Sequence, residues 1–203
     1  GTFLNTGTIR SDDDAAIDYD ASTTTSTIVN SGLISGTIGV LVEKGLTGEA
    51  PNLAAQIITN SGTIEGRSGR ALDLGAGDDR LVNTDAGLIL GDADFGIGDD
   101  SAAFARATRA FGLFDGGEGE DEMIFDAAFA DLSVLSLKGR VLSLSLAGDM
   151  FLRATNWETF TFTDGSYSYA RIAALAPVPV PVPAAGLLAL GGIGALAALR
   201  RRR

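Results

Sequence analysis

The chain has 203 residues, 45% of them hydrophobic and 20% charged, which is enough for one ordered body followed by a tail. It contains no Cys and no His, so disulfides, thiolate metal sites and imidazole catalysis are excluded. The formal net charge is −11 although the last four residues are all Arg, so we expect no nucleic-acid binding, and divalent cations or neutral glycans are easier partners.

Four stretches of the first half share a pattern in which an Asn precedes a Gly and then an Ile. The Ile residues of these stretches, Ile9, Ile34, Ile64 and Ile89, are 25, 30 and 25 residues apart. Such a period is typical of stacked structural units. Asn and Gly both tolerate left-handed backbone geometry, so we interpret them as sharp corners. We expect the four Ile side chains to form one buried column.

Further apolar runs follow each motif, as at 40–42 and 56–59, so three short strands per coil is the simplest account. In a solenoid the other strands of a coil supply the long crossover that parallel strands need. We therefore predict an all-β fold, a single-stranded right-handed parallel β-helix, with segments 11–14 and 45–52 as outer insertions. A β-sandwich is the alternative, but it gives no reason for the motif to recur in register.

A second repeat places an acidic residue every 21 positions, at Asp79, Asp100 and Asp121. Each follows a Gly-x-Gly pair. The third copy, from Gly116 to Met123, resembles the nonapeptide G-G-x-G-x-D-x-U-x of calcium-binding RTX proteins, whereas the first two copies lack the leading Gly. If 21 residues make one coil, these carboxylates lie above one another at the ~4.8 Å spacing of adjacent strands.

Stacked carboxylates repel one another unless they are protonated, reach into water or are bridged by a cation. One hypothesis is a Ca²⁺ site that uses aspartate and backbone oxygens. The alternative is that the Gly-Asp motifs only form tight corners with solvated side chains. The candidate metal ligands are Asp79, Asp100, Asp121, Asp78 and Asp99.

The region after the repeats is rich in aromatic residues, at Phe104, Phe111, Phe114, Phe125 and Phe129. We interpret these side chains as the core of wider coils that approach a cap, because an open solenoid end would expose a sheet edge and a section of core.

Strict alternation of Leu and Ser at 142–146 then indicates strands in the cap. The runs on either side of Asp164-Gly165 predict a hairpin with Phe and Tyr on one face, and Trp157 is expected to pack under it. We divide the chain into a β-helix repeat region at 1–126, a C-terminal β cap at 127–170, a linker with a sorting motif at 171–183, and a transmembrane helix with an Arg cluster at 184–203.

The tail changes composition to alternating Pro and Val, and residues 184–199 then carry no polar side chain. A helix of this length spans about 24 Å, close to the ~30 Å hydrocarbon core once Pro-Val residues contribute. The terminal Arg200, Arg201, Arg202 and Arg203 are expected to stay on the cytoplasmic side, which places the β body outside.

The segment Val180, Pro181, Val182, Pro183 and Ala184, followed by a hydrophobic stretch and an Arg run, resembles the VPLPA-type PEP-CTERM sorting domain, with Val182 where that variant usually has Leu. The resemblance implies a Gram-negative bacterium, export with transient anchoring in the inner membrane, and cleavage by an exosortase. It also implies a final place at the cell surface or in the extracellular matrix, often with extracellular polysaccharide. Export needs a leader, so we expect the given sequence to be a fragment.

The repeats resemble the passengers of bacterial surface proteins and autotransporters, and we expect a non-catalytic protein of adhesion or biofilm type rather than an enzyme. One alternative is an RTX-like module that folds with calcium on export. Another is a polysaccharide lyase or glycoside hydrolase, because β-helices host such enzymes. A lyase would need Ca²⁺ and a basic proton acceptor, for which Arg67, Arg70 and Arg80 near Asp79 are the available grouping.

Overall fold

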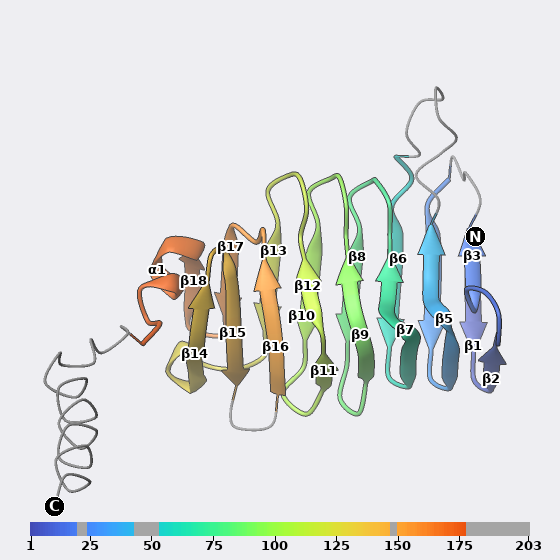
Figure 1. The fold of residues 1–203 in the computed structure, drawn as a ribbon, viewed down its shortest axis with the longest axis horizontal. Coiled ribbons are helices and arrows are strands. Elements are labelled where there is room, and N and C mark those ends of the chain that lie inside the picture. Colours follow the sequence, from blue (N-terminus) through green and yellow to red (C-terminus); the bar gives the residue numbers. More distant parts are fainter. Residues whose placement is uncertain (20–23, 43–52, 147–149, 178–203) are drawn as a thin grey trace, which may run out of the picture.

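The computed structural model describes residues 1–19, 24–42, 53–146 and 150–177, and strands make up nearly all of their regular structure. The strands form two sheets, and the chain passes from one sheet to the other and back, so successive turns add strands to both. The turns follow one another along the long axis of the molecule, from β1–β3 at one end to β14–β18 and the short helix α1 at the other (Figure 1). The fold is all-β, as predicted.

The first sheet has eight strands in the order β1-β4-β6-β8-β10-β13-β17-β18, paired in parallel except for the final hairpin. Alternate residues of each strand face inward, and the register stacks Ile28, Ile58, Leu81, Ala102 and Met123 into one buried column. Its strands are β1 (Thr2–Asn5), β4 (Ser26–Asn30), β6 (Gln56–Asn60), β8 (Arg80–Asn83), β10 (Ser101–Phe104), β13 (Glu122–Phe125), β17 (Thr159–Phe162) and β18 (Gly165–Ser168).

The second sheet has ten strands. Its main path runs β14-β15-β16-β12-β9-β7-β5-β2, with β3 also paired to β5 and β11 to β9. Ile9, Ile34, Ile64 and Ile89 occupy consecutive register positions, so the predicted isoleucine column is confirmed; three of the four are fully buried, and Ile9 at the end of the stack is partly buried. The strands are β2 (Thr8–Arg10), β3 (Ile17–Tyr19), β5 (Leu33–Val42), β7 (Thr63–Asp73), β9 (Leu88–Asp94), β11 (Arg109–Phe111), β12 (Leu113–Asp115), β14 (Leu132–Lys138), β15 (Val141–Leu146) and β16 (Met150–Thr155).

The prediction of three short strands per coil is wrong for the middle turns. There the two runs expected as separate strands belong to one long strand, β5, β7 or β9. The register shifts between Gly36 and Ile38 and again between Glu65 and Arg70. A bulge of this kind takes up extra residues and bends the strand without ending the ladder, so the pairing continues around the bend.

The interpretation of the Asn-Gly motif as left-handed corners is also wrong. Among the described residues the only non-glycine positions with positive φ are Ala86 and Asn156, and the motif glycines Gly32 and Gly62 are not left-handed either. A Cβ at Gly62 would instead lie 2.1 Å from the carbonyl oxygen of Gly32. Glycine is therefore required because successive turns approach too closely for any side chain.

The motif asparagines form a buried hydrogen-bonded ladder. Asn5 Nδ2 donates to Asn30 Oδ1 at 2.8 Å, Asn30 to Asn60 at 2.7 Å and Asn60 to Asn83 at 2.7 Å. The ladder ends on Thr108, whose Oγ1 accepts from Asn83 Nδ2. Each amide group therefore ties its own turn to the next turn through groups that water does not reach.

The predicted cap hairpin is present as β17 and β18, with Phe160 opposite Tyr167. Its two turn residues are Thr163 and Asp164, one position earlier than the predicted Asp-Gly pair. On the other sheet, β14, β15 and β16 pair antiparallel. A 3₁₀ turn (Phe129–Asp131) precedes β14, and α1 (Tyr169–Ala173) buries Ile172 at the end of the stack.

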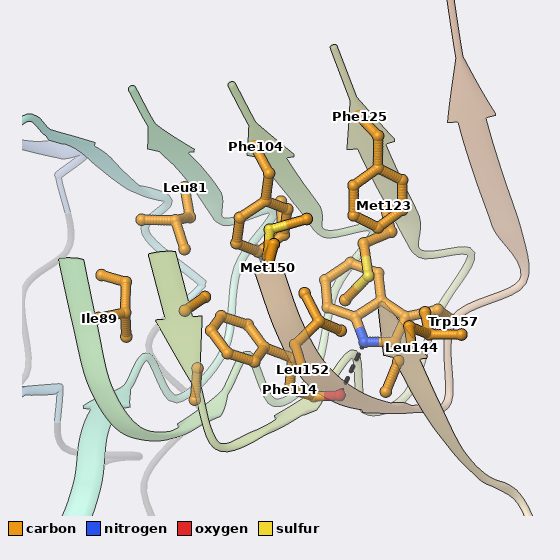
Figure 2. Packing of buried hydrophobic residues seen from close by; sticks show 14 of the residues in the cluster. Leu81, Ile89, Phe104, Phe114, Met123, Phe125, Leu144, Met150, Leu152 and Trp157 are labelled. Carbon is orange, nitrogen blue, oxygen red and sulfur yellow. Dashed lines mark hydrogen bonds between the residues drawn. The ribbon is translucent and has the colours of Figure 1, made fainter. Parts of the chain in front are cut away.

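Most of the aromatic residues lie in the core, as predicted. Trp157 is buried under the cap, and its Nε1 donates to the carbonyl oxygen of Phe114 at 2.9 Å (Figure 2). Its ring meets the Phe95 ring edge-on. Phe104 is buried between Phe114 and Phe125. The prediction is wrong for Phe111, because 43% of the surface of that residue is exposed. Its neighbour on β11, Ala110, faces inward, so the alternation of the strand turns Phe111 out.

No helix within the described residues is long and apolar enough to cross a bilayer. The predicted transmembrane helix at 184–203 and the sorting motif at 180–184 lie outside the described residues, as does the predicted insertion at 45–52. The other predicted insertion, at 11–14, carries exposed Asp12, Asp13 and Asp14.

Candidate functional site

The structure brings Asp79, Asp100 and Asp121 together in one column, and we call these three residues the Asp column. Each residue directly precedes a strand of the eight-stranded sheet, and the first residues of those strands are register partners. The exposed fraction is only 1%, 2% and 1% in turn, so the idea of solvated corner side chains is wrong for these three. The predicted 21-residue turn is confirmed.

The Asp column is held by hydrogen bonds that cross from turn to turn. In each step one carboxylate oxygen accepts the backbone N–H of the preceding turn: Asp79 from Gln56 at 2.6 Å, Asp100 from Asp79 at 2.6 Å, and Asp121 from Asp100 at 2.8 Å. Glu158 continues the series by accepting from the N–H of Asp121 at 3.0 Å. The column thus links five consecutive levels of the stack.

The second carboxylate oxygen, Oδ2, of each residue in the Asp column is buried without a hydrogen-bond partner. Burial raises the pKa of Asp79 to about 8, of Asp100 to about 7 and of Asp121 to about 6. The backbone N–H bonds oppose this shift, and neighbouring carboxylates reinforce it. The folded chain therefore holds protons on these side chains well above the usual range of a carboxyl group.

Glycines make room for this column. Gly96 and Gly98 both have positive φ. A Cβ on Gly96 would lie 2.0 Å from the carbonyl oxygen of Gly75 in the preceding turn, and a Cβ on Gly98 would lie 2.1 Å from that of Gly77. The repeated Gly-x-Gly pair is thus needed twice over, for its backbone conformation and for the close approach of the turns.

The other two predicted ligands, Asp78 and Asp99, lie apart on the outer surface. The Asp78 carboxylate accepts the N–H of Asp99 at 3.0 Å, and that of Asp99 accepts the N–H of Glu120 at 3.0 Å. The five predicted ligands therefore form two lines, one buried and one exposed. Ca²⁺ takes six to eight oxygen ligands, and within the described residues no three acidic side chains gather as a metal site. Calcium binding here stays a prediction.

The basic grouping expected for a lyase is not formed. Arg67 and Arg70 lie on β7 of the ten-stranded sheet, and Arg80 lies on β8 of the other sheet. Arg67 is paired with Asp12 at 2.9 Å, and Arg70 is paired with Asp73. The hydrogen bond to the Asp73 carboxylate raises the pKa of Arg70, so that guanidinium is even less able to lose a proton and act as a neutral proton acceptor. The arrangement gives the lyase alternative no support.

Sequence reasoning missed Glu158 as the end of the column. It lies 37 residues after Asp121 because the antiparallel strands β14, β15 and β16 intervene, so no 21-residue period could reveal it. The asparagine ladder was missed in a different way. Its Asn residues were found by their spacing, but they were assigned to backbone corners instead of buried side-chain bonds.

Surface hollows among the described residues are further candidate sites, and two of them are lined largely by apolar side chains. One, of about 370 Å³, crosses β8, β10, β13 and β17 and is lined mainly by apolar side chains such as Val82, Ala103 and Ile124. The other, of about 190 Å³, lies on the ten-stranded sheet beside β11, β14 and β16. Comparisons of the chain with protein-family models, curated proteins and solved structures return no match.

Proposed function

We propose that this chain is a non-catalytic, exported surface or extracellular-matrix protein whose β body is a rigid stalk for adhesion or biofilm structure. The observation that carries the proposal is the use made of the repeated residues. Hydrogen bonds from one turn to the next use the motif Asn residues and the Asp column. The Gly-x-Gly pairs allow those turns to approach closely. Residues that recur for stacking build length and rigidity, which an elongated matrix protein requires.

The finer fold that we propose is a single-stranded right-handed parallel β-helix with a β cap, followed by a transmembrane helix in 184–203. The support is topological. β4, β5 and β6 follow one another in the chain, and β4 and β6 pair in parallel while β5 lies in the other sheet. A crossover between parallel strands is right-handed in about 98% of cases. Repetition of that crossover generates a right-handed helix.

The localisation that we propose is the cell surface or extracellular matrix of a Gram-negative bacterium, which the chain reaches after transient anchoring in the inner membrane and processing by an exosortase. Its support is the likeness of residues 180–203 to PEP-CTERM sorting domains. Extracellular polysaccharide is the partner that this localisation suggests.

Expression of the full chain behind a secretion leader, in exosortase-positive and exosortase-deleted strains, tests this localisation. We expect a shortened surface form, with its new C-terminus near the motif, only in the positive strain. Pro181→Ala combined with Pro183→Ala should leave the uncut form in the inner membrane, whereas Pro179→Ala, a proline outside the motif, should be processed normally. Equal processing of all forms in both strains would refute the proposal.

A calcium-dependent module remains the second candidate because three carboxylate oxygens of the Asp column are buried without partners. If calcium completes this column, circular dichroism should show β structure that appears only with millimolar Ca²⁺, and a chelator should lower the melting temperature by ten degrees or more. An unchanged melting temperature in chelator would refute this second candidate function.

A further inference from the structure

Three large apolar side chains, from β11, β14 and β16, are exposed around one hollow on the ten-stranded sheet. The exposed fractions are 43% for Phe111, 50% for Leu135 and 46% for Phe151. All three line the hollow of about 190 Å³, which adjoins a second hollow of about 270 Å³. The two hollows share Ser143 and Arg153, so they form one trough, which we call the cap trough.

Strand pairing places these side chains from several elements on one surface. Ser143 of β15 lies opposite Arg153 of β16, and on its other side opposite Ser136 of β14. β11 joins the same surface, because the N–H of Arg153 donates to the carbonyl oxygen of Gly112 at 3.0 Å. The trough is therefore built on paired strands, not on loops, which keeps the spacing of its side chains fixed.

The charge of this face is opposite to that of the molecule. The four strands β11, β14, β15 and β16 contain Arg109, Lys138 and Arg153 but no acidic residue, in a chain of net charge −11. Lys138 and Arg153 line the second hollow directly. Arg153 also reaches Asp92 at 3.4 Å, but both side chains are about half exposed, and such an exposed ion pair contributes little free energy.

We propose that the cap trough binds an acidic saccharide chain, a site that deepens the surface function proposed above and rests on it. Phenylalanine rings offer flat apolar faces to the C–H faces of sugar rings, and the hydroxyls of Ser136 and Ser143 can exchange hydrogen bonds with sugar hydroxyls. Lys138 and Arg153 supply donors for the carboxylates of uronate units, and Arg can grip a carboxylate with two N–H groups.

Asp92 lies close enough to Arg153 to oppose an anion, but screening weakens the repulsion from acidic residues farther than about 8 Å from the trough at physiological ionic strength. A nucleic acid fits less well, since tight binding to a phosphate backbone uses six to ten cationic contacts and these strands offer Arg109, Lys138 and Arg153. A flat membrane surface would not fill a concave trough.

Binding of the full chain, purified in mild detergent, to oligogalacturonate tests the site by calorimetry. Phe111→Ser with Phe151→Ser should weaken binding at least tenfold, and Lys138→Gln with Arg153→Gln should weaken it tenfold and remove most of its salt dependence. The matched controls are Phe3→Ser, which removes an exposed ring at the opposite end, and Arg80→Gln, which removes an exposed cation from the other sheet. Both controls should bind like the parent chain.

The neutral galactose oligomer of equal length should bind at least tenfold more weakly. Equal affinity of the parent and both trough variants would overturn the proposal, as would stronger binding to single-stranded nucleic acid or to anionic vesicles. So would a dimer in sedimentation that Phe151→Ser dissociates. Melting curves verify that each variant is folded. Since the purified chain needs no processing, failure here leaves the export proposal intact, and failure of export leaves this measurement unaffected.

Discussion

At the scale of single residues, the asparagines show how one side chain can serve two turns. Asn60 donates to Asn83 and accepts from Asn30, and it is fully buried. In a water-excluded position each group that loses its partner costs about 1 to 3 kcal/mol. The amides of the ladder are therefore coupled, and the loss of one leaves an unpaired group in each of the two neighbouring turns.

Asn60→Ala should lower the free energy of unfolding by ~3 kcal/mol or more, because Asn30 loses an acceptor and Asn83 loses a donor. Urea unfolding measures this change. Ser61→Ala is the neighbouring control. Ser61 is exposed and its hydroxyl makes only a long bond, 3.4 Å, to the carbonyl oxygen of Asn30, so the substitution should change the free energy of unfolding by less than about 0.5 kcal/mol. Similar losses for both variants would mean that the ladder contributes little.

Substitution of two glycines with nearly equal φ distinguishes the cost of backbone strain from the cost of steric overlap. Gly69 has φ +102° and no atoms near a Cβ, whereas Gly96 has φ +96° and a carbonyl oxygen at 2.0 Å. Gly69→Ala should cost roughly 1 to 3 kcal/mol from strain alone. Gly96→Ala should cost more than about 4 kcal/mol or prevent folding. Chemical denaturation compares them, and equal costs would show that the turns can move apart.

At the scale of elements, the Asp column couples folding to pH. The unfolded chain releases these protons near pH 3.8, while the folded chain keeps them up to about pH 6, 7 and 8 in Asp121, Asp100 and Asp79. The folded state thus binds more protons in this window, so the contribution of the column to stability is complete below pH 3.8 and is lost as pH rises to about 8.

Melting temperature should therefore fall as pH increases from about 5 to about 8 in the parent chain, and the slope should flatten in the triple variant Asp79→Asn, Asp100→Asn, Asp121→Asn. Asn keeps the acceptor oxygen and cannot ionise, so the triple variant should match or exceed the parent at pH 8. Asp78→Asn with Asp99→Asn, on the exposed line, should keep most of the parental slope, because burial is the largest cause of the raised pKa values and these two carboxylates are a smaller one. A parental slope in the triple variant would contradict the assignment.

At the scale of the whole molecule, the stack is built of turns that contact only their neighbours, so one whole turn should be removable. Deletion of residues 80–100 joins Asp79 to Ser101. Ser101 is the register partner of Arg80, the residue that follows Asp79 now, so the deletion removes one complete turn. Thr108 could then accept from Asn60 as it accepts from Asn83 now. We expect a folded chain that is shorter by about one strand spacing, ~4.8 Å.

Small-angle scattering and circular dichroism test this deletion against removal of residues 80–89, which breaks the 21-residue register. The full-turn deletion should keep the β spectrum and a cooperative melt, whereas the partial deletion should abolish both. If the two deletions are equally disruptive, the turns do not contribute to stability as separate, removable units.

The sequence by itself determined the all-β class, the isoleucine column, the 21-residue Asp column and the position of Trp157, because a stacked fold repeats its constraints at a fixed spacing. Only the tertiary structure decided which neighbour each repeated polar group meets. The asparagines proved to be a buried ladder, the carboxylates were turned inward, and Glu158 closed their column from 37 residues away. The cap trough likewise depends on the antiparallel pairing of β15 with β16 and on the position of β11 beside them, which bring Phe111, Ser143 and Phe151 together. Periodicity identifies stacked positions, but burial and partner choice depend on how the turns pack.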